Sequence, residues 1–438
     1  MDVLVKILGL LFSLTILIIV HEMGHFLFSK LFKTRVEKFY LFFNPWFSLF
    51  KIKRGGTEYG IGWLPLGGYV KIAGMIDESM DKKQLKQEPQ SWEFRAKPTW
   101  QRLLIMLGGV MFNFILAMFI YAMILYTWGK EYVPAENAVH GIYCDSLALE
   151  AGLQQGDKVL YVDTYRVEHL QDVRLHILLD NGKSITVKRD GETKKIEIPE
   201  NFHKKLLEND RSLFIDFRFP FIIDSVLPDS GADRAGLKKN DRITAVNGIE
   251  TPSFYEYAEI IKNFKGETVE LNIERNNREK EVKVQLDSTG KIWAIARPIS
   301  EIYETVKVNY SFFESFPAGI KEGVNKLVFY VRQFKLIFTK EGVEKVGSFI
   351  TIGSIYPGIW DWQSIWALTA LLSIILAFMN ILPIPALDGG HVLFVLYEMI
   401  TGRKPGDKFM EYAQIAGMII LIAILVFALK NDIFRLID

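Results

Sequence analysis

The chain has 438 residues, of which 50% are hydrophobic, and its formal net charge is +1. This near-neutral balance excludes a nucleic-acid-binding protein or a protein with long charged tails, so we expect no nucleic acid partner. The only cysteine, Cys144, excludes an intrachain disulfide framework and any CxxC site, and we expect it to be a small packed or partly exposed side chain.

Hydrophobic residues gather in four stretches, at about 3–27, 103–127, 366–387 and 412–429. Each stretch is long enough to cross about 30 Å of hydrocarbon, which predicts a polytopic α-helical membrane protein with four transmembrane helices. The region between the first two stretches and the short loop after the third are rich in Lys and Arg, so both are predicted to be cytoplasmic. The long region 128–365 and both termini are then predicted to be extracytoplasmic.

The first stretch contains the sequence HEMGH at residues 21–25. On a helix, HExxH brings His21 and His25 to one face, one turn apart, where they can hold Zn²⁺ while Glu22 activates water. A chance match and a cleaved signal peptide are the ordinary alternatives, but the apolar run is too long for a signal peptide. On a continuous helix His21 lies about 13 Å from Lys30, which puts the motif at membrane depth. Ionisable groups at that depth are costly, and they indicate a functional site.

The region 128–365 contains a self-match at a spacing of 84 residues. The sequence AGL at 151–153, followed by Gly156-Asp157, recurs as AGL at 235–237, followed by Asn240-Asp241. Two copies of one small domain are therefore predicted, with β-type runs at 184–188 and 268–274 and turns at 190–191 and 276–277. The pattern resembles PDZ domains of bacterial proteases, at about 130–200 and 216–288. Such grooves capture an extended chain end, but domains that only block access remain an equal alternative.

A catalytic zinc site needs a third protein ligand and one open position. The candidate is Asp388, in the sequence NILPIPALDGG that starts at Asn380. An isolated Asp at the end of a transmembrane helix is commonly an interfacial residue or the start of a turn. Pro383 and Pro385 favour a site instead, because they break the helix at membrane depth and free backbone groups that must line a cavity.

HExxH in the first stretch and NxxPxPxLDG in the third together resemble the site-2 protease family of intramembrane zinc metalloproteases, over essentially the whole chain. The resemblance implies one zinc ion per chain, Glu22 as the general base and the metal ligands His21, His25 and Asp388. It also implies that the substrate is bound by Asn380, with Gly60, Gly62, Pro383 and Pro385 beside it.

Further segments match the family in part. The stretch 58–71 is similar to the family's membrane-reentrant β-loop, predicted here as a membrane-associated β-hairpin at about 35–75; a plain amphipathic hairpin on the membrane surface is the alternative. A strand edge in that loop would replace the hydrogen bonds of an unwound substrate helix.

The family commonly has Gly-Pro-x-x-Asn in the second span, whereas this chain has Val110 in place of the proline and keeps Asn113. The amphipathic stretch 324–338 could form a gate on the membrane surface or pack against the PDZ-like copies. His391 is either a hydrogen-bond partner of Asp388 or an ordinary interfacial residue.

The predicted domains are 1–127 with the first two spans and HExxH, PDZ-like domains at 128–210 and 211–298, a linker at 299–365 and the last two spans at 366–438.

The predicted function is intramembrane cleavage of transmembrane segments of single-span proteins, of the anti-sigma-factor or signal-peptide-remnant type, in regulated intramembrane proteolysis. The resemblance implies a bacterial inner-membrane protein with the PDZ-like domains extracytoplasmic and the active site toward the cytoplasm. Membrane lipid and an upstream site-1-type protease are the expected further partners. The alternatives are an idle PDZ membrane scaffold and an ion transporter with a His/Glu/Asp relay, and bound zinc would argue against both.

Overall fold

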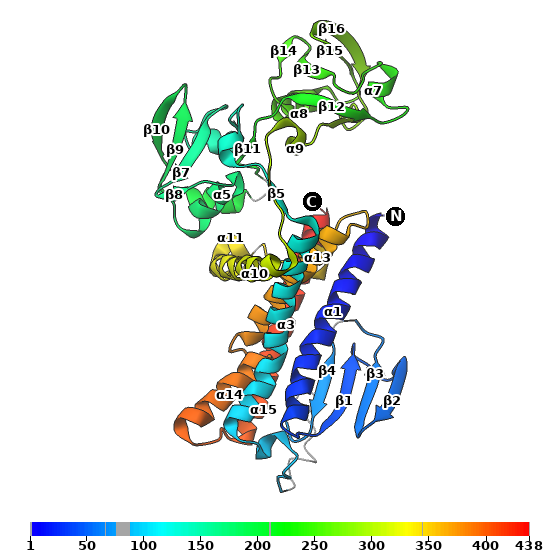
Figure 1. Cartoon of the computed structure of the whole chain (residues 1–438), viewed down its shortest axis with the longest axis vertical. Coiled ribbons are helices and arrows are strands. Elements are labelled where there is room, and N and C mark those ends of the chain that lie inside the picture. The colour runs from blue at the N-terminus through cyan, green and yellow to red at the C-terminus, as the bar shows by residue number, and fades with distance from the viewer. Residues whose placement is uncertain (1, 66, 76–87, 210–211, 344, 438) are drawn as a thin grey trace. The chain divides into compact units, whose positions relative to one another are not determined.

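The computed structural model describes residues 2–65, 67–75, 88–209, 212–343 and 345–437. The chain separates into two compact units, Met1–Gly129 with Asn309–Asp438, and Lys130–Val308. Figure 1 shows the first unit as long helices with one sheet beside them, and the second as two smaller modules of strands and short helices. The membrane-type segments and the region between them are thus separate bodies.

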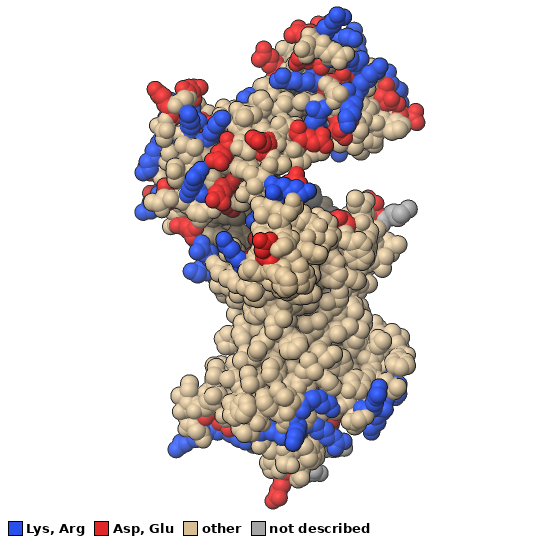
Figure 2. Space-filling model, in the orientation of Figure 1, with Lys and Arg blue, Asp and Glu red and all other residues tan. Residues whose placement is uncertain are grey.

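Four long apolar helices form the frame of the first unit. They are α1 (Asp2–Leu31), α3 (Thr99–Trp128), α13 (Trp362–Ile381) and α15 (Asp407–Ile437). All four are long and apolar enough to cross a membrane, which agrees with the four predicted spans. In Figure 2 a broad band of this unit carries no charged residues, while Lys and Arg gather at the end formed by α14 (Asp388–Thr401) and the sheet.

The third apolar stretch is interrupted at its two prolines, as predicted, so its helix is shorter than the stretch 366–387. Helix α13 stops at Ile381 rather than near residue 387, because Pro383 and Pro385 cannot continue a helix. Asp388 is therefore not the last residue of a transmembrane helix but the first residue of a separate helix, α14. The acidic side chain lies in the first turn of α14, where the helix dipole stabilises a negative charge.

Helix α3 is continuous and packs against α1, α13, α14 and α10 (Phe312–Phe334). Gly24 of α1 and Gly108 of α3 allow the two helix backbones to approach closely, since a Cβ on Gly24 would lie 2.2 Å from the Gly108 carbonyl oxygen.

The predicted amphipathic stretch 324–338 is the second half of α10 and the 3-10 turn that follows it. It packs against α3 and α13, a contact that neither interpretation of the sequence included. The connection to α13 contains α11 (Lys340–Val343) and α12 (Phe349–Ser354).

The predicted β-loop forms a four-stranded sheet rather than a single hairpin. Its strands are β1 (Val36–Leu41), β2 (Phe50–Arg54), β3 (Thr57–Ile61) and β4 (Tyr69–Ile72), in the order β2-β3-β1-β4. Strand β1 pairs parallel with β3 and antiparallel with β4, which leaves β4 as an edge strand. The sheet lies beside α1 (Figure 1). Within the predicted stretch 58–71, Leu66 lies outside the described residues.

The second unit contains two modules of similar construction, each with its own buried core. The first is built from β6 (Ile142–Cys144), α4 (Ser146–Glu150), β7 (Lys158–Val162), β8 (Tyr165–Arg166), α5 (Leu170–Leu179), β9 (Ser184–Arg189), β10 (Glu192–Glu197), α6 (Phe202–Glu208) and β11 (Ile215–Phe217). The second is built from β12 (Phe221–Val226), α7 (Gly231–Arg234), β13 (Arg242–Val246), β14 (Ile249–Glu250), α8 (Phe254–Ile261), β15 (Thr268–Arg275), β16 (Arg278–Gln285), β17 (Ala294–Ala296) and α9 (Ile299–Ile302).

Equivalent ion pairs mark the internal repeat. Arg189 donates two hydrogen bonds of 2.7 Å to Asp157, and Arg275 donates two of 2.6 Å to Asp241. Both carboxylates are buried, and both follow the AGL sequence that revealed the repeat. Each pair joins the start of one strand to the end of a neighbouring strand, so the repeated sequence corresponds to repeated packing. The predicted runs at 184–188 and 268–274 are strands β9 and β15.

The predicted linker 299–365 is divided between the two units. Strand β18 (Val306–Val308) pairs antiparallel with β5 (Lys130–Tyr132) and belongs to the second unit, whereas α10 belongs to the first. The predicted boundary at 210–211 lies outside the described residues.

Cys144 is a packed side chain, and burial raises the pKa of its thiol to about 12.

Candidate metal centre

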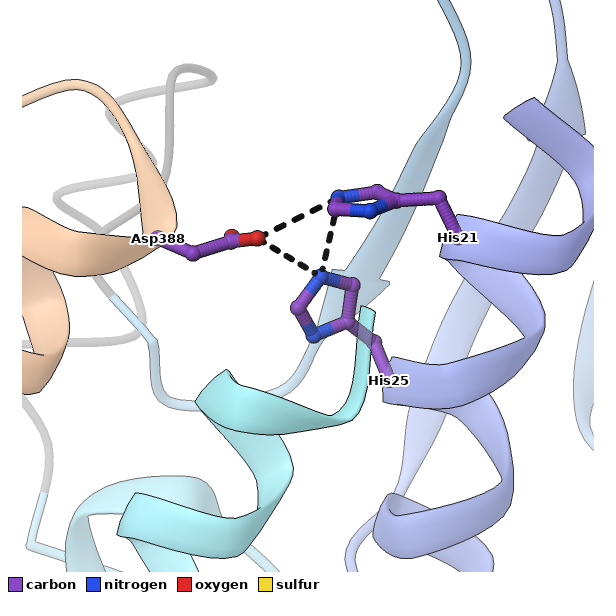
Figure 3. A group of neighbouring side chains, drawn as sticks. All are labelled: His21, His25 and Asp388. Atoms are coloured by element: carbon purple, nitrogen blue, oxygen red, sulfur yellow. Dashed lines mark hydrogen bonds and ion pairs between the residues drawn. The ribbon is translucent and has the colours of Figure 1, made fainter. Parts of the chain in front are cut away.

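The three predicted metal ligands converge on one point, although they come from opposite ends of the chain (Figure 3). Helix α1 brings the Nε2 atoms of His21 and His25 to 3.4 Å from each other. The Oδ2 atom of Asp388, at the start of α14, lies 3.2 Å from Nε2 of His21 and 3.3 Å from Nε2 of His25. Three potential ligand atoms thus form a nearly equilateral triangle.

The triangle has the dimensions that zinc requires. Zn–N and Zn–O bonds of about 2.0–2.1 Å in a tetrahedral site separate the ligand atoms by about 3.3–3.4 Å. The Oδ2 atom of Asp388 is buried and accepts no hydrogen bond among the described residues. A buried carboxylate oxygen without a donor normally has another partner, and two imidazole nitrogens facing it are suited to share a cation with it. The side chains present therefore fit a zinc ion with one open position.

Helix α3 supports the imidazoles from behind. The Nδ1 atom of His25 donates a 2.8 Å hydrogen bond to the backbone carbonyl of Ile105, which leaves its Nε2 lone pair for a metal. A helix carbonyl is usually screened by the side chains three and four positions later, which here are Gly108 and Gly109. Because these two residues have no side chains, the imidazole can reach the carbonyl.

Substituting Gly109 by alanine is expected to disturb this arrangement. A Cβ at residue 109 would lie 2.5 Å from Nε2 of His25 and 2.6 Å from Cε1 of His21, so both imidazoles would have to move. We expect overpacking of about 1–3 kcal/mol and a loss of zinc affinity, measured by zinc retention against a chelator. The matched control is Gly353→Ala on α12, where the nearest atom is 3.6 Å from the added carbon. Equal zinc retention in both variants would contradict the role given to Gly109.

Glu22 lies between the two histidines and lines a cavity of about 400 Å³ together with the ligand triangle. Val70 of β4 lines the same cavity as the Glu22 carboxylate. Asn380 of α13 lines the same cavity, and its Nδ2 atom is 3.3 Å from Nε2 of His21. A proton-accepting carboxylate, an amide and a strand edge therefore surround the space next to the metal position.

The two prolines shape this space from behind. Both lie in the loop between α13 and α14. Pro385 packs closely against Gly417 of α15, so closely that a Cβ at residue 417 would lie only 1.8 Å from the Pro385 carbonyl oxygen. The next residues, Ala386 and Leu387, line the cavity, whereas Pro383 and Pro385 are not among its lining residues. Their effect is to turn the chain so that Asp388 faces α1.

The structure does not bring Gly60 and Gly62 to the cavity. Gly60 lies on β3, an inner strand, and a Cβ there would be 2.3 Å from the ring of Tyr40. A Cβ on Gly62 would be 2.1 Å from the backbone oxygen of Phe43. Both glycines therefore permit close packing within the sheet, and their role in substrate binding stays a prediction. The strand that lines the cavity is β4.

Several residues at the centre were not singled out from the sequence as site residues. They include Val70, Asn113, His391 and Gln414. His391 follows Asp388 by one helical turn and also lines a neighbouring cavity of about 250 Å³, beside the ion pair of Arg102 with Glu398. The spacing of four between Gly109 and Asn113 was the available signal for a shared face of α3.

Helices that could cross a membrane, with a His-His-Asp triangle and a carboxylate between the histidines, define a membrane-bound metalloprotease. A family model described as "Peptidase family M50" matches residues 9–424, and the chain belongs to this zinc-dependent protease family. The family membership favours an enzyme over a scaffold or an ion transporter.

The relatives match over nearly their whole length. The "Regulator of sigma-E protease RseP" of Escherichia coli (strain K12) is 29% identical, with 97% of each chain covered. The "Putative zinc metalloprotease" of Vibrio cholerae is 28% identical, with 99% of this chain and 100% of the relative covered. The "Protease RseP" of Yersinia pestis is also 28% identical, with both chains covered completely.

Proposed function

We propose that this protease is an intramembrane endopeptidase that cleaves transmembrane segments of single-span membrane proteins. The observation that carries the proposal is the position of the ligand triangle. His21 and His25 belong to an unbroken apolar helix and, on the rise of that helix, His21 lies about 13 Å from the charged residue Lys30. A peptide bond cut at this point is within the thickness of a bilayer.

The ligand set that we propose is His21, His25 and Asp388, with one zinc ion per chain. Zinc, when bound, supplies a Lewis acid for peptide hydrolysis. Glu22 lies in the same cavity and is not part of the triangle. We assign to it the general-base step, in which its carboxylate takes a proton from the attacking water and then passes that proton to the leaving amine.

Strand β4 is the proposed docking edge for the substrate. A transmembrane helix hides its carbonyls in internal hydrogen bonds, so it must unwind before it can be cut. An added strand on the outer edge of β4, opposite β1, would replace these hydrogen bonds beside the metal position, since Tyr69, Val70, Lys71 and Ile72 line the cavity. Asn380 would hold the substrate backbone from the opposite side, on α13.

The two modules of the second unit are proposed to be PDZ-like domains. They support each other, because Tyr143 stacks on Tyr255 with ring centroids 4.6 Å apart and donates a hydrogen bond to Glu259. The pair of PDZ-like domains would either exclude proteins with large extramembrane domains by bulk or bind a chain end.

The Lys and Arg residues at the α14 end of the helical unit support a cytoplasmic position for that end, in a bacterial inner membrane (Figure 2). The PDZ-like domains would then be extracytoplasmic.

The names of the relatives support a class of substrate. Two of those described above are named as regulators of sigma-E or as RseP. We therefore propose that the substrates are anti-sigma factors shortened beforehand by a site-1-type protease, or signal-peptide remnants, which reach the enzyme through membrane lipid.

Metal removal tests this function. Detergent-purified protein is incubated with a single-span test substrate, with and without a zinc chelator, and cleavage is followed by gel electrophoresis and mass spectrometry. We expect the chelator to abolish cleavage and a slight excess of Zn²⁺ to restore it, because none of the described side chains that line the cavity can act as a Lewis acid in place of zinc. Cleavage that continues after the zinc content has fallen to zero would contradict the proposal.

A further inference from the structure

We propose that Asn113 is a positioning residue that keeps the proton of His21 on Nδ1, because its side-chain oxygen accepts a hydrogen bond from that Nδ1–H group. This inference rests on the proposed ligand set. It concerns how α3 prepares His21 for zinc, whereas the family resemblance concerns only the presence of an asparagine in this span.

The chemistry of imidazole sets the requirement. A neutral imidazole carries one proton, and only the nitrogen without the proton can bind a metal. In the ligand triangle both histidines present Nε2, so both must carry the proton on Nδ1. Each Nδ1 then needs a hydrogen-bond acceptor, because an unpaired buried N–H is costly.

His25 has such an acceptor and His21 has a candidate. The carbonyl of Ile105 accepts from Nδ1 of His25 at 2.8 Å. The side chain of Asn113 lies 3.2 Å from Nδ1 of His21 and is completely buried. Ile105, Gly109 and Asn113 are spaced by four residues, so one face of α3 supports both imidazoles.

The orientation of the Asn113 amide decides which ring nitrogen of His21 carries the proton. In the orientation present, Nδ2 faces Nδ1 of His21 and Oδ1 has no hydrogen-bond partner among the described residues. An amide that donates to Nδ1 would put the imidazole proton on Nε2, where the metal must bind. A half-turn of the amide exchanges Oδ1 and Nδ2 with almost no change in shape, and it gives Nδ1–H an acceptor. We therefore assign Oδ1 to His21 in the zinc-loaded protein.

The test compares two substitutions of similar size in the full chain. Asn113→Leu removes the acceptor, and we expect zinc affinity to fall about 10- to 100-fold, as for other residues that hydrogen-bond metal-binding histidines. Asn113→Asp keeps an acceptor and cannot donate, so we expect zinc affinity close to that of the wild type. Affinity is measured by competition with a chelator for Zn²⁺, and the absorption spectrum of the Co²⁺-substituted protein reports whether the site stays tetrahedral.

The control is Ser373→Ala. The Ser373 hydroxyl donates to the backbone carbonyl of Asn113, so its loss perturbs the packing of α13 on α3 without changing the amide. We expect unchanged zinc affinity. Weak zinc binding by Asn113→Asp, or wild-type binding by Asn113→Leu, would overturn the inference. If Asn113→Leu does not fold, Asn113→Asp decides alone, and absence of zinc from the wild type would instead refute the proposed function.

Discussion

Replacing Glu22 by glutamine is expected to reduce cleavage about 10²- to 10⁴-fold, the usual contribution of a general base. Glutamine has the shape of glutamate, but its amide cannot take a proton from water. Glu22 is not part of the ligand triangle, so the zinc content of the variant should equal that of the wild type. Cleavage rate and zinc content are both measured on detergent-purified protein.

The matched control is Glu322→Gln on α10, which makes the same chemical change at a residue that does not line the metal cavity. Its cleavage rate should equal that of the wild type. Persistent cleavage by Glu22→Gln would remove Glu22 from the catalytic step. Loss of zinc from Glu22→Gln would show instead that this carboxylate holds the metal.

Replacing Asp388 by asparagine is expected to weaken zinc binding by more than about 10- to 100-fold, which is the usual cost of losing a residue that only hydrogen-bonds a metal ligand. Oδ2 of Asp388 faces both Nε2 atoms, and a neutral amide oxygen is a weaker partner for a divalent cation. Cleavage should fall with zinc occupancy and recover in part at high Zn²⁺ concentration. Chelator competition and the cleavage assay, each over a range of Zn²⁺ concentrations, provide the measurement.

Asp361→Asn is the control for this prediction. Asp361 also stands at the start of a helix, where it accepts a hydrogen bond of 2.8 Å from the Ser364 backbone amide. Loss of a negative charge at a helix start costs about 0.3–1 kcal/mol at either site, so the two variants should lose similar stability when both are compared in the metal-free form. Only Asp388→Asn should lose zinc. Wild-type zinc affinity in Asp388→Asn would mean that the third ligand lies elsewhere.

Local patterns in the sequence were sufficient for the spans, the repeat and the histidine pair. A run of apolar residues defines a membrane-type helix by its length alone, and HExxH defines two imidazoles on one face by helical periodicity alone. The prolines at 383 and 385 indicated a broken helix for the same reason, since a proline acts on its own backbone. These features depend on residues that are neighbours in the chain.

The convergence of Asp388 with His21 and His25 was predicted from the family motif, but the form of the site depended on packing. The edge of the sheet that faces the metal is β4, because strand order follows pairing between distant segments and not the glycine pattern of β3. The position of Asp388 at the start of α14 also depends on where α13 ends.

The sequence by itself determined where helices can cross a membrane and which side chains can bind zinc, because these properties belong to single segments. Only the tertiary structure decided that Ile105, Gly109 and Asn113 lie behind the two imidazoles. No local rule links α3 to α1. The contact arises because Gly24 and Gly108 let two helix backbones approach closely, and such an approach is a property of the packed pair.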